Sequence, residues 1–411
     1  MKLDTYKMKD YILSFIAKFK SFRKNHKELF LNFKYIFGIL ICNFLILTIW
    51  VNRVNFYPEN FILWVQGRIA SAKFGGKFPC DIKGNKISYE NFKFFDNNMV
   101  VLSDGAYNIV GKNGSIIRTE SHNFSNPSLK TSGIRSIIFD CGGKDYKIES
   151  TAQTIYSGES EKKIISCDIS DVGPYVIAQE STSHLSEMVV YGKNNAEKYR
   201  YFFSEYYLTD VSIDTFGKNA FVSAIFSVDE TVSSKIYILN FKSLSPIAEF
   251  DLNDNMVSQI KYTSNGNIIA IGDKYIAFIN IKSKNVKKVF YKNKILKFFD
   301  YNPENGICCC LSSSVNDSND DEILMLNLDG KQLFRIESKE NFIGLSHNNS
   351  RTVGLSKNKL IVLNSSGNIT GYLNINANVK KAMISSNSKV YTMEYGKIDK
   401  IKLKKLQKYK Y

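Results

Sequence analysis

The sequence predicts an all-β protein, a β-propeller of four-stranded blades behind one N-terminal transmembrane helix. Two observations lead to this prediction. From about Phe92 to Leu406 one pattern returns at intervals of roughly 35–50 residues: four apolar strands separated by polar turns that contain Gly or Asn. Ahead of this repeat, an uncharged apolar run covers Tyr35–Val51.

The repeat is clearest when Ile260–Tyr291 is aligned with Gly344–Ile375. The second strand of one unit, Ile268–Ile271, then matches Thr352–Leu355 in the other, and the third strands match as well. A four-stranded sheet cannot bury both of its faces alone, so such units stack radially as the blades of a propeller.

Eight units can be delimited in this way, and a count of seven remains the alternative if one unit has been divided wrongly. The predicted blades are 92–120, 125–157, 163–203, 207–252, 256–291, 295–337, 341–376 and 379–404. The last unit shows only three clear strands. We expect a strand within Asp81–Glu90 to complete it, because a propeller must pair its first and last blades to avoid open edges.

The net charge of +16 is concentrated at the two ends of the chain. Residues 1–34 carry a net charge of +6 and residues 379–411 a net charge of +8, which leaves +2 for residues 35–378. A nucleic-acid-binding domain would carry a basic stripe on its folded surface. The nearly neutral body therefore predicts no nucleic-acid partner.

The run Tyr35–Val51 contains 17 uncharged residues between Lys34 and Arg53. This length is near the lower limit for a membrane-spanning helix. No small-residue cleavage site follows it closely, so we expect an uncleaved signal-anchor that contacts membrane lipid; a buried soluble helix is the alternative. Nine basic residues precede the run, and few follow it within about 20 residues, which predicts a cytoplasmic N-terminus and an extracytoplasmic propeller in a single-pass protein of the cell membrane.

The segments outside the helix and the propeller are predicted to be short. Residues 1–34 form a basic amphipathic segment that we expect on the inner leaflet; a merely topogenic tail is the alternative. The inner-leaflet contacts would be Lys18, Lys20, Arg23 and Lys24. Residues 52–80 form a juxtamembrane neck, 81–404 the propeller and 405–411 a basic tail, which we expect to be mobile because nothing beyond Leu403 is periodic.

The seven cysteines do not suggest a metal site or a disulfide framework. Cys308–Cys310 are consecutive in a predicted strand, where neighbouring side chains point to opposite faces, so three in a row cannot converge on one metal. Asp317–Glu322 begins like a calcium loop but lacks the required Gly and the final Glu. We predict a solvated hairpin loop there, with weak cation binding as the alternative, and neither metal nor cofactor elsewhere.

No catalytic motif is present. The sequence contains no G-x-S-x-G elbow, P-loop or H-E-x-x-H. Its two tryptophans, Trp50 and Trp64, both precede the propeller, which excludes the Trp-based repeats of quinoprotein dehydrogenases, sialidases and WD40 proteins. We therefore predict no enzymatic activity.

Three stretches, Gly75–Gly84, Val100–Ile117 and Ser125–Ile148, resemble a family of Gram-positive bacterial membrane proteins that is catalogued as a domain of unknown function. The elements that carry the resemblance are Asn126-Pro127, Gly133-x-Arg135 and Asp140-x-Gly142-Gly143. The resemblance covers most of residues 35–400. It implies a basic N-terminus, one membrane helix and a WD40-like or quinoprotein-like propeller outside, and it implies no activity. More loosely, the chain is similar to scaffolding propellers of envelope-assembly machines.

These observations predict a membrane-anchored extracytoplasmic propeller that binds or scaffolds other proteins of the cell envelope. One alternative is a wall-glycan hydrolase that uses carboxylates facing the channel. Another is a binder of anionic wall polymer through the basic C-terminus. Its contacts would be Lys400, Lys402, Lys404, Lys405, Lys408 and Lys410.

Overall fold

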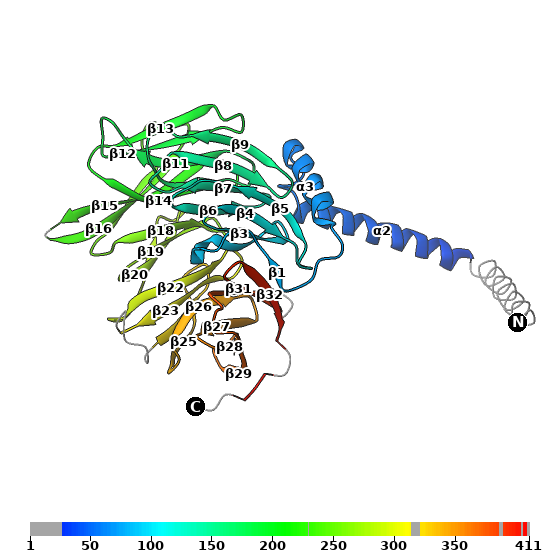
Figure 1. Ribbon diagram of the computed structural model, residues 1–411. Helices are drawn as coiled ribbons and strands as arrows, with labels where there is room; N and C mark the ends of the chain where they lie inside the picture. Colours follow the sequence, from blue (N-terminus) through cyan, green and yellow to red (C-terminus); the bar gives the residue numbers. More distant parts are fainter. Residues whose placement is uncertain (1–26, 229, 314–320, 386–388, 404–405, 409–411) are drawn as a thin grey trace, which may run out of the picture. The chain divides into compact units, whose positions relative to one another are not determined.

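The computed structural model describes residues 27–228, 230–313, 321–385, 389–403 and 406–408. The chain forms two compact units, Met1–Phe61 and Ile62–Tyr411. The first unit contains helix α2 (Lys27–Val51) and the start of helix α3 (Pro58–Ser71). The second contains the rest of α3 and all of the β-structure (Figure 1).

Helix α2 includes the whole apolar run Tyr35–Val51. Large apolar side chains of this run, such as Phe44 and Leu47, are exposed. Within the residues that the structure describes, no helix is long and apolar enough to cross a membrane. The transmembrane anchor stays a prediction, and the predicted inner-leaflet residues Lys18, Lys20, Arg23 and Lys24 lie outside the described residues.

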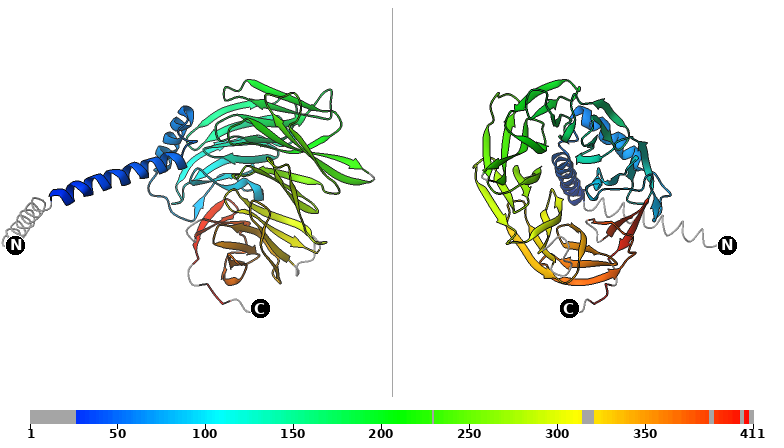
Figure 2. Two further views of the ribbon diagram at one scale, coloured as in Figure 1. Left: turned by 180° about the vertical axis from the view of Figure 1, so that it is seen from behind. Right: turned by 60° about the vertical axis from the view of Figure 1, so that its left-hand side comes forward.

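The second unit is a propeller of eight four-stranded antiparallel sheets, arranged as a ring in Figure 2. Blades 1 and 2 consist of β2 (Phe92–Phe95), β3 (Asn98–Leu102), β4 (Ala106–Val110), β5 (Ile116–Ser121), β6 (Pro127–Ser132), β7 (Arg135–Asp140), β8 (Asp145–Ser150) and β9 (Thr154–Glu159). Blades 3 and 4 consist of β10 (Ile164–Ile169), β11 (Tyr175–Glu180), β12 (Ser186–Tyr191), β13 (Glu197–Phe203), β14 (Tyr207–Ile213), β15 (Asn219–Val228), β16 (Thr231–Asn240) and β17 (Ala248–Leu252).

The remaining blades continue the same order. Blades 5 and 6 consist of β18 (Val257–Tyr262), β19 (Asn267–Gly272), β20 (Tyr275–Asn280), β21 (Val286–Phe290), β22 (Ile295–Asn302), β23 (Gly306–Ser312), β24 (Asp321–Leu326) and β25 (Gln332–Ser338). Blades 7 and 8 consist of β26 (Phe342–His347), β27 (Arg351–Ser356), β28 (Lys359–Asn364), β29 (Ile369–Asn374), β30 (Lys381–Ile384), β31 (Lys389–Glu394), β32 (Lys397–Lys402) and β1 (Cys80–Asp81).

The prediction of eight four-stranded blades is confirmed, and the alternative of seven is wrong. The first strand of each blade lines the centre of the ring and is called the inner strand. We call the face at which the inner strands begin the upper face, and the face at which they end the lower face. Because neighbouring strands are antiparallel, the second-to-third turns lie on the upper face and the third-to-fourth turns on the lower face.

The ring closes in blade 8, where the first strand of the propeller pairs with the last. Cys80 lies opposite Ile398, and Asp81 opposite Lys397. The N–H of Ile82 adds a bond of 2.9 Å to the carbonyl of Gly396. The closing strand is therefore earlier and shorter than the expected one within Asp81–Glu90.

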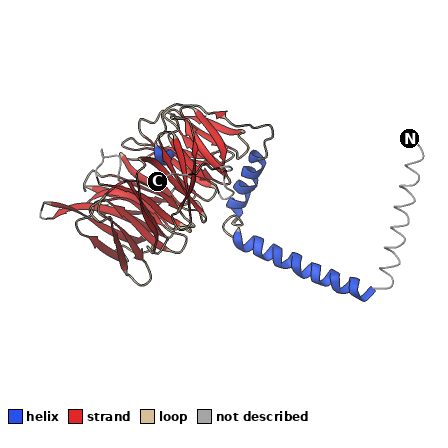
Figure 3. Ribbon diagram, turned by 90° about the horizontal axis from the view of Figure 1, so that it is seen from below, coloured by secondary structure: helices blue, strands red, loops and turns tan. Residues whose placement is uncertain are grey.

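The rest of that segment leaves the sheet and turns towards the centre of the ring. Blade 1 holds its start, because the side chain of Asn108 accepts the N–H of Lys83. The segment ends in a short 3-10 helix, η1 (Tyr89–Asn91), drawn in blue among the strands in Figure 3.

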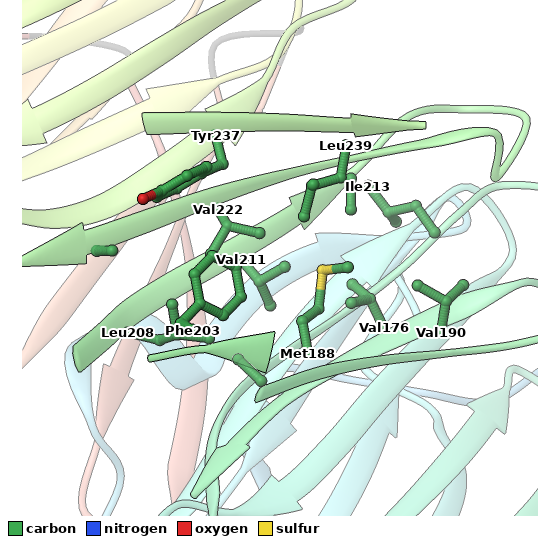
Figure 4. Packing of buried hydrophobic residues seen from close by; sticks show 13 residues of the cluster. Val176, Met188, Val190, Phe203, Leu208, Val211, Ile213, Val222, Tyr237 and Leu239 are labelled. Carbon is green, nitrogen blue, oxygen red and sulfur yellow. The ribbon is translucent and has the colours of Figure 1, made fainter. Parts of the chain in front are cut away.

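Neighbouring blades pack face to face through eight apolar clusters. Figure 4 shows the cluster between blades 3 and 4, where Met188 and Phe203 meet Val211 and Tyr237. The three consecutive cysteines divide between two clusters. Cys309 packs towards blade 5, whereas Cys308 and Cys310 pack towards blade 7, so the prediction that they are core residues facing opposite sides is confirmed.

Blades 3–7 share a feature that the sequence analysis did not anticipate. Near the start of each inner strand the pairing with the second strand shifts by one residue. The extra residues are Ile165, Thr209, Ser258, Lys297 and Ile343. Such bulges redirect side chains at the end of a strand, and here they lie at the upper face.

Candidate functional site

The inner strand of each blade has one edge that its own sheet leaves unpaired, and this edge faces the channel. Its backbone N–H and C=O groups need other partners. Side chains of neighbouring blades supply many of them. We call these side chains the polar belt: Lys93, Lys130, Asp168, Asp210, Ser212, Asp300, Ser346 and Lys381.

The belt links one blade to the next in chain order. Lys93 donates to the carbonyl of Leu129 in blade 2 (3.1 Å). Asp210 of blade 4 accepts the N–H of Ile260 in blade 5 (2.9 Å). The other links of this kind join Asp168 to Ile213 N, Ser212 to Tyr262 N, Asp300 to His347 N and Ser346 to Ile384 N. The belt therefore closes strand edges, which is a structural task.

Lys130 and Asp210 form the most buried ion pair of the belt. Their atoms Nζ and Oδ1 are 2.5 Å apart, and Ser166 donates to the same oxygen. Burial lowers the pKa of Lys130, but the charges of Asp210 and Asp168 outweigh it and leave that pKa raised. Burial likewise opposes ionisation of Asp210, and Lys130 and Lys261 overcome it, so the pKa of Asp210 is lowered.

Helix η1 brings Tyr89 and Glu90 into the channel. The ammonium of Lys381 donates to the carbonyl of Tyr89 and lies 4.1 Å from the centre of its ring. Glu90 is 3.7 Å from the ammonium of Lys93. Burial would raise the pKa of Glu90, but the charges of Lys93, Lys261 and Lys381 prevail and lower it.

Asp300 and His347 form a second polar contact on the opposite side of the channel. Nδ1 of His347 lies 3.0 Å from Oδ2 of Asp300, and Nε2 is buried without a hydrogen-bond partner. Burial would raise the pKa of Asp300, but its bond to His347 and the charge of Lys381 leave it lowered.

A chamber of about 600 Å³ lies in the channel beside the belt. Its walls include Lys261, Tyr262, Tyr301 and Asn302 near the lower ends of the inner strands. In the described chain the side chain of Lys261 makes no hydrogen bond or ion pair. Among the described residues no group of three His, Cys, Asp or Glu is arranged to hold a metal ion.

The channel geometry does not favour acid–base catalysis. A glycosidase needs one carboxyl that keeps its proton near neutral pH, which requires a raised pKa. The pKa values of Glu90, Asp210 and Asp300 are all lowered. Burial raises the pKa of Asp171, but Ser132 donates to that carboxylate. The belt residues are therefore better suited to holding the blades together than to transferring protons.

The upper face carries exposed apolar side chains on consecutive blades. Four of them, Tyr207, Met256, Ile295 and Ile343, lie at or just before the start of the inner strands of the consecutive blades 4–7. The others lie at upper-face turns or strand ends of blades 3–5 and are Leu185, Phe202, Val232 and Phe290. We call these eight residues the apolar arc. It follows the same blades that carry the bulges.

Two lysines near the arc are paired with carboxylates of blade 6. Lys297 contacts Asp321 at 2.9 Å, and Lys294 contacts Glu322 at 3.1 Å. The bulge residue Lys297 is thereby held by its own blade. An apolar centre beside mutually neutralised charges is the usual composition of a protein-binding surface.

A family model of proteins of unknown function, DUF5711, matches residues 81–403, which is the propeller. The chain belongs to this family. No curated protein sequence matches it.

Solved structures with the same architecture confirm the fold of this family member. The C-terminal WD40 domain of Sif2 has a TM-score of 0.54 at 9% identity, with 80% of this chain and 99% of that chain covered. Sqt1 from Saccharomyces cerevisiae has a TM-score of 0.56 at 10% identity, with the same coverage. BamB from Moraxella catarrhalis has a TM-score of 0.49 at 11% identity, with 80% of this chain and 99% of that chain covered.

Membership of the DUF5711 family and the propeller fold confirm part of the resemblance found in the sequence. The Gram-positive origin and the membrane anchor that it implied stay predictions. The family has no assigned function, so the surfaces of the chain are the evidence for what this protein does.

The structure describes three of the six lysines predicted to contact an anionic polymer. Lys400 donates to the carbonyl of Lys112 (3.2 Å) and lies over the ring of Phe78. Lys402 and Lys408 are exposed. Lys404, Lys405 and Lys410 lie outside the described residues.

Two residues of the tail that we expect to be mobile, Leu406 and Gln407, contact the propeller. Gln407 forms two backbone hydrogen bonds with Tyr372 and so adds to the outer edge of blade 7. Gly371 permits this approach, because a Cβ there would lie 2.6 Å from the carbonyl oxygen of Gln407. Leu406 also packs against the apolar cluster between blades 7 and 8.

The predicted loop at 317–322 is described only at its end. Residues 314–320 lie outside the described residues, whereas Asp321 and Glu322 belong to β24 and are buried. Lys297 pairs with Asp321, and Arg335 and Lys294 pair with Glu322. These two carboxylates are therefore committed to ion pairs, and the prediction that they lie in a solvated loop is wrong.

The sequence analysis missed both the polar belt and the apolar arc. Each inner strand places one titratable residue at or near the belt, as in Lys93, Lys130, Asp168, Asp210, Lys261, Asp300, His347 and Lys381. An alignment of the eight inner strands would have shown a charged or His residue recurring within apolar strands. The arc has a weaker signature, since an apolar residue at the start of a strand usually signals burial.

Proposed function

We propose that this protein is a membrane-anchored propeller that binds another protein of the cell envelope through its apolar arc. The observation that supports the proposal most directly is the arc itself. Eight apolar side chains on one face come from consecutive blades, and Tyr207 alone is 58% exposed. Exposed apolar side chains grouped on one face of a soluble domain mark interaction sites.

The composition of the arc favours a protein partner. Aromatic residues and Met are enriched at the centres of protein interfaces, and the arc contains Phe202, Tyr207, Met256 and Phe290. Its residues project from strand ends and short turns of a rigid scaffold, so little conformational entropy is lost when a partner packs against them. The partner we propose is therefore a folded protein with a complementary apolar patch.

The anchor rests on the apolar run Tyr35–Val51 and on the charges around it. The run is entirely helical within α2, and its apolar side chains are exposed on all sides. The excess of basic residues before it favours a cytoplasmic N-terminus. On this proposal the propeller lies outside the cytoplasm.

No observation favours the alternative of a glycan hydrolase. Its channel carboxylates are held by neighbouring blades, and three of them have lowered pKa values. The alternative of an anionic-polymer binder rests on the basic residues near the C-terminus, of which Lys400 and Lys402 lie in β32 of blade 8.

Site-specific photo-cross-linking tests the proposed binding face. A benzophenone amino acid would replace Tyr207, Met256 or Ile295 in the full chain expressed in its own cells. We expect an adduct of the same mass from all three positions. The matched controls are Leu244 and Leu333, two exposed apolar residues of the lower face. The double variant Tyr207→Asp, Ile295→Asp should abolish the adduct at Met256, whereas Leu244→Asp, Leu333→Asp should not.

The proposal fails if the lower-face controls give the same adduct as the arc, or if the aspartate pair in the arc leaves the adduct at Met256 unchanged. The anchor is tested separately. Protease added to intact wall-less cells should digest the propeller and spare residues 1–34, and protection of the propeller would contradict the proposed topology.

A further inference from the structure

A group of basic residues gathers on the lower face, where blades 8 and 1 meet. We call it the basic seam: Arg68, Lys73, Lys77, Lys112, Lys389, Lys400 and Lys402. Only Lys400 and Lys402 were among the lysines predicted from the sequence. The others come from α3, the neck, and turns or strand ends at the lower face of blades 1 and 8.

The topology explains why these residues meet. Lys112 lies in the third-to-fourth turn of blade 1, and Lys389 and Lys402 pair opposite each other at the lower ends of β31 and β32. Lys400 reaches across the junction to the carbonyl of Lys112. Lys73 donates to the carbonyl of Ile117 (2.7 Å), which places the neck beside the fourth strand of blade 1.

Few of the charges of the seam are paired in the described part of the chain. Within the described part of the chain, Arg68 is the member that forms an ion pair, with Asp96 at 3.3 Å. Burial and the charges of Arg68 and Lys389 lower the pKa of Lys112. Burial and the charges of Lys389 and Lys402 do the same for Lys400. These lysines therefore repel one another and would be stabilised by an anionic surface.

Exposed apolar side chains accompany the seam. Ile62 and Ile69 are seven residues apart and so lie on one side of α3, and they are 59% and 71% exposed. Phe74, between the seam residues Lys73 and Lys77, is 96% exposed. Basic residues beside apolar side chains are the usual composition of a segment that lies in a membrane interface.

The chain also brings a bilayer close to this face. Helix α3 packs against the lower face of blade 1, because Ser71 accepts a bond from Asn98 and Ala70 contacts the apolar cluster there. Only residues 52–57 separate α3 from α2. An anchor in α2 would therefore hold the basic seam within a few residues' reach of the membrane surface.

We propose that the basic seam, together with Ile62, Ile69 and Phe74, lies on a bilayer that contains anionic phospholipid. The proposal deepens the proposed function and rests on its membrane anchor. It commits to lipid headgroups, because a soluble polyanion would account for the lysines but not for the exposed apolar residues. In this arrangement the edge of the lower face at blades 8 and 1 lies on the membrane, and the apolar arc on the opposite face remains accessible to a protein partner.

Photo-cross-linking to lipid in nanodiscs tests the proposal with the full chain. A benzophenone amino acid replaces Phe74 or, as a matched control, Leu244, which is 94% exposed at the lower face of blade 4. The discs contain phosphatidylcholine alone or with added phosphatidylglycerol. We expect several-fold more lipid adduct at position 74 than at 244 in the anionic discs, and a loss of that excess in the neutral discs or at high salt.

Charge reversal then identifies the residues responsible. The variant Lys77→Glu, Lys112→Glu, Lys402→Glu should remove the excess adduct at position 74. The control Lys242→Glu, Lys284→Glu, Lys331→Glu changes three exposed lysines in lower-face turns of blades 4–6 and should leave the adduct unchanged.

Three results would overturn the inference: equal adducts at positions 74 and 244, equal adducts in neutral and anionic discs, or no effect of the seam variant. A fourth such result is suppression of adduct formation by soluble poly(glycerol phosphate) at physiological salt, which would favour a wall polymer as the ligand. Failure of the anchor gives a different result. The chain would then not enter neutral discs at all, whatever the sequence of the seam.

Discussion

The hydroxyl of Tyr89 joins the start of the propeller to the inner strand of blade 7 through both backbone groups of Leu345. It donates to the carbonyl of Leu345 at 2.6 Å and accepts the N–H of the same residue at 3.0 Å. The two residues are 256 positions apart. Tyr89 therefore forms a second closure of the ring, across the channel, in addition to the pairing of β1 with β32.

Removing this hydroxyl should destabilise the propeller. Tyr89→Phe leaves the N–H and C=O of Leu345 without these partners, and an unmade hydrogen bond at a buried group costs about 1–3 kcal/mol. The contact of the ring with Lys381 would remain. Urea unfolding followed by far-UV circular dichroism measures the decrease in the free energy of unfolding. The matched control Tyr207→Phe, at an exposed tyrosine, should change the free energy of unfolding by less than about 0.5 kcal/mol; equal effects of the two substitutions would show that Tyr89 has no role in closure.

A second prediction concerns the pairing of the closing strand β1 with β32. Ile82→Pro removes the N–H that bonds to the carbonyl of Gly396 and should weaken the pairing of β1 with β32. We expect a lower melting temperature and a greater tendency to aggregate, because the outer edge of blade 8 becomes unpaired. The control Ile82→Ala keeps the N–H. If both variants melt together, the backbone bond contributes nothing to closure.

The blade count could be predicted because the strand-and-turn pattern is local. Each unit repeats apolar strands and polar turns within about 50 residues, and nothing distant is needed to recognise it. The closing pair was predicted in principle but misplaced, since Cys80–Asp81 is too short to show any periodicity of its own.

The path of Tyr89 and the polar belt could not be predicted in the same way. Lys130 and Asp210 are 80 residues apart and meet only because the ring places the inner strands around one channel. Because most lysines are exposed, the sequence alone gives no sign that Lys130 faces the channel. Its partners become visible only when the eight inner strands are aligned in space.

A third prediction concerns Cys309 in the apolar cluster between blades 5 and 6. The side chain of Cys309 is fully buried against blade 5, and burial raises the pKa of its thiol. Cys309→Ser places a hydroxyl in this apolar cluster and should lower the free energy of unfolding by about 1–3 kcal/mol. The control Cys42→Ser changes an exposed cysteine and should have no effect. One equivalent of zinc in the purified protein, lost in Cys309→Ser, would contradict the assignment.

The last prediction concerns the pH dependence of stability and Lys93, the partly buried lysine of blade 1. Burial lowers the pKa of Lys93 to about 8; Glu90 opposes this shift, and Lys261, Lys381 and Lys130 add to it. The ordinary value is 10.5, so between about pH 8 and pH 10.5 the unfolded chain binds more protons at this residue than the folded one. Lys93 therefore reduces stability most below pH 8, by at most about 3 kcal/mol, and this cost disappears as the pH rises.

Lys93→Met removes the titrating group and should remove this contribution to the slope. The wild-type free energy of unfolding, minus that of the variant, should rise between pH 7.5 and 10.5 in a series of urea titrations. Thiols and tyrosines of the unfolded chain titrate in the same range, but they are common to both proteins and cancel in the difference. Lys287→Met, at an exposed lysine of β21, provides the control and should give a difference that is independent of pH. A flat difference for Lys93→Met as well would mean that Lys93 keeps its ordinary pKa in the folded channel.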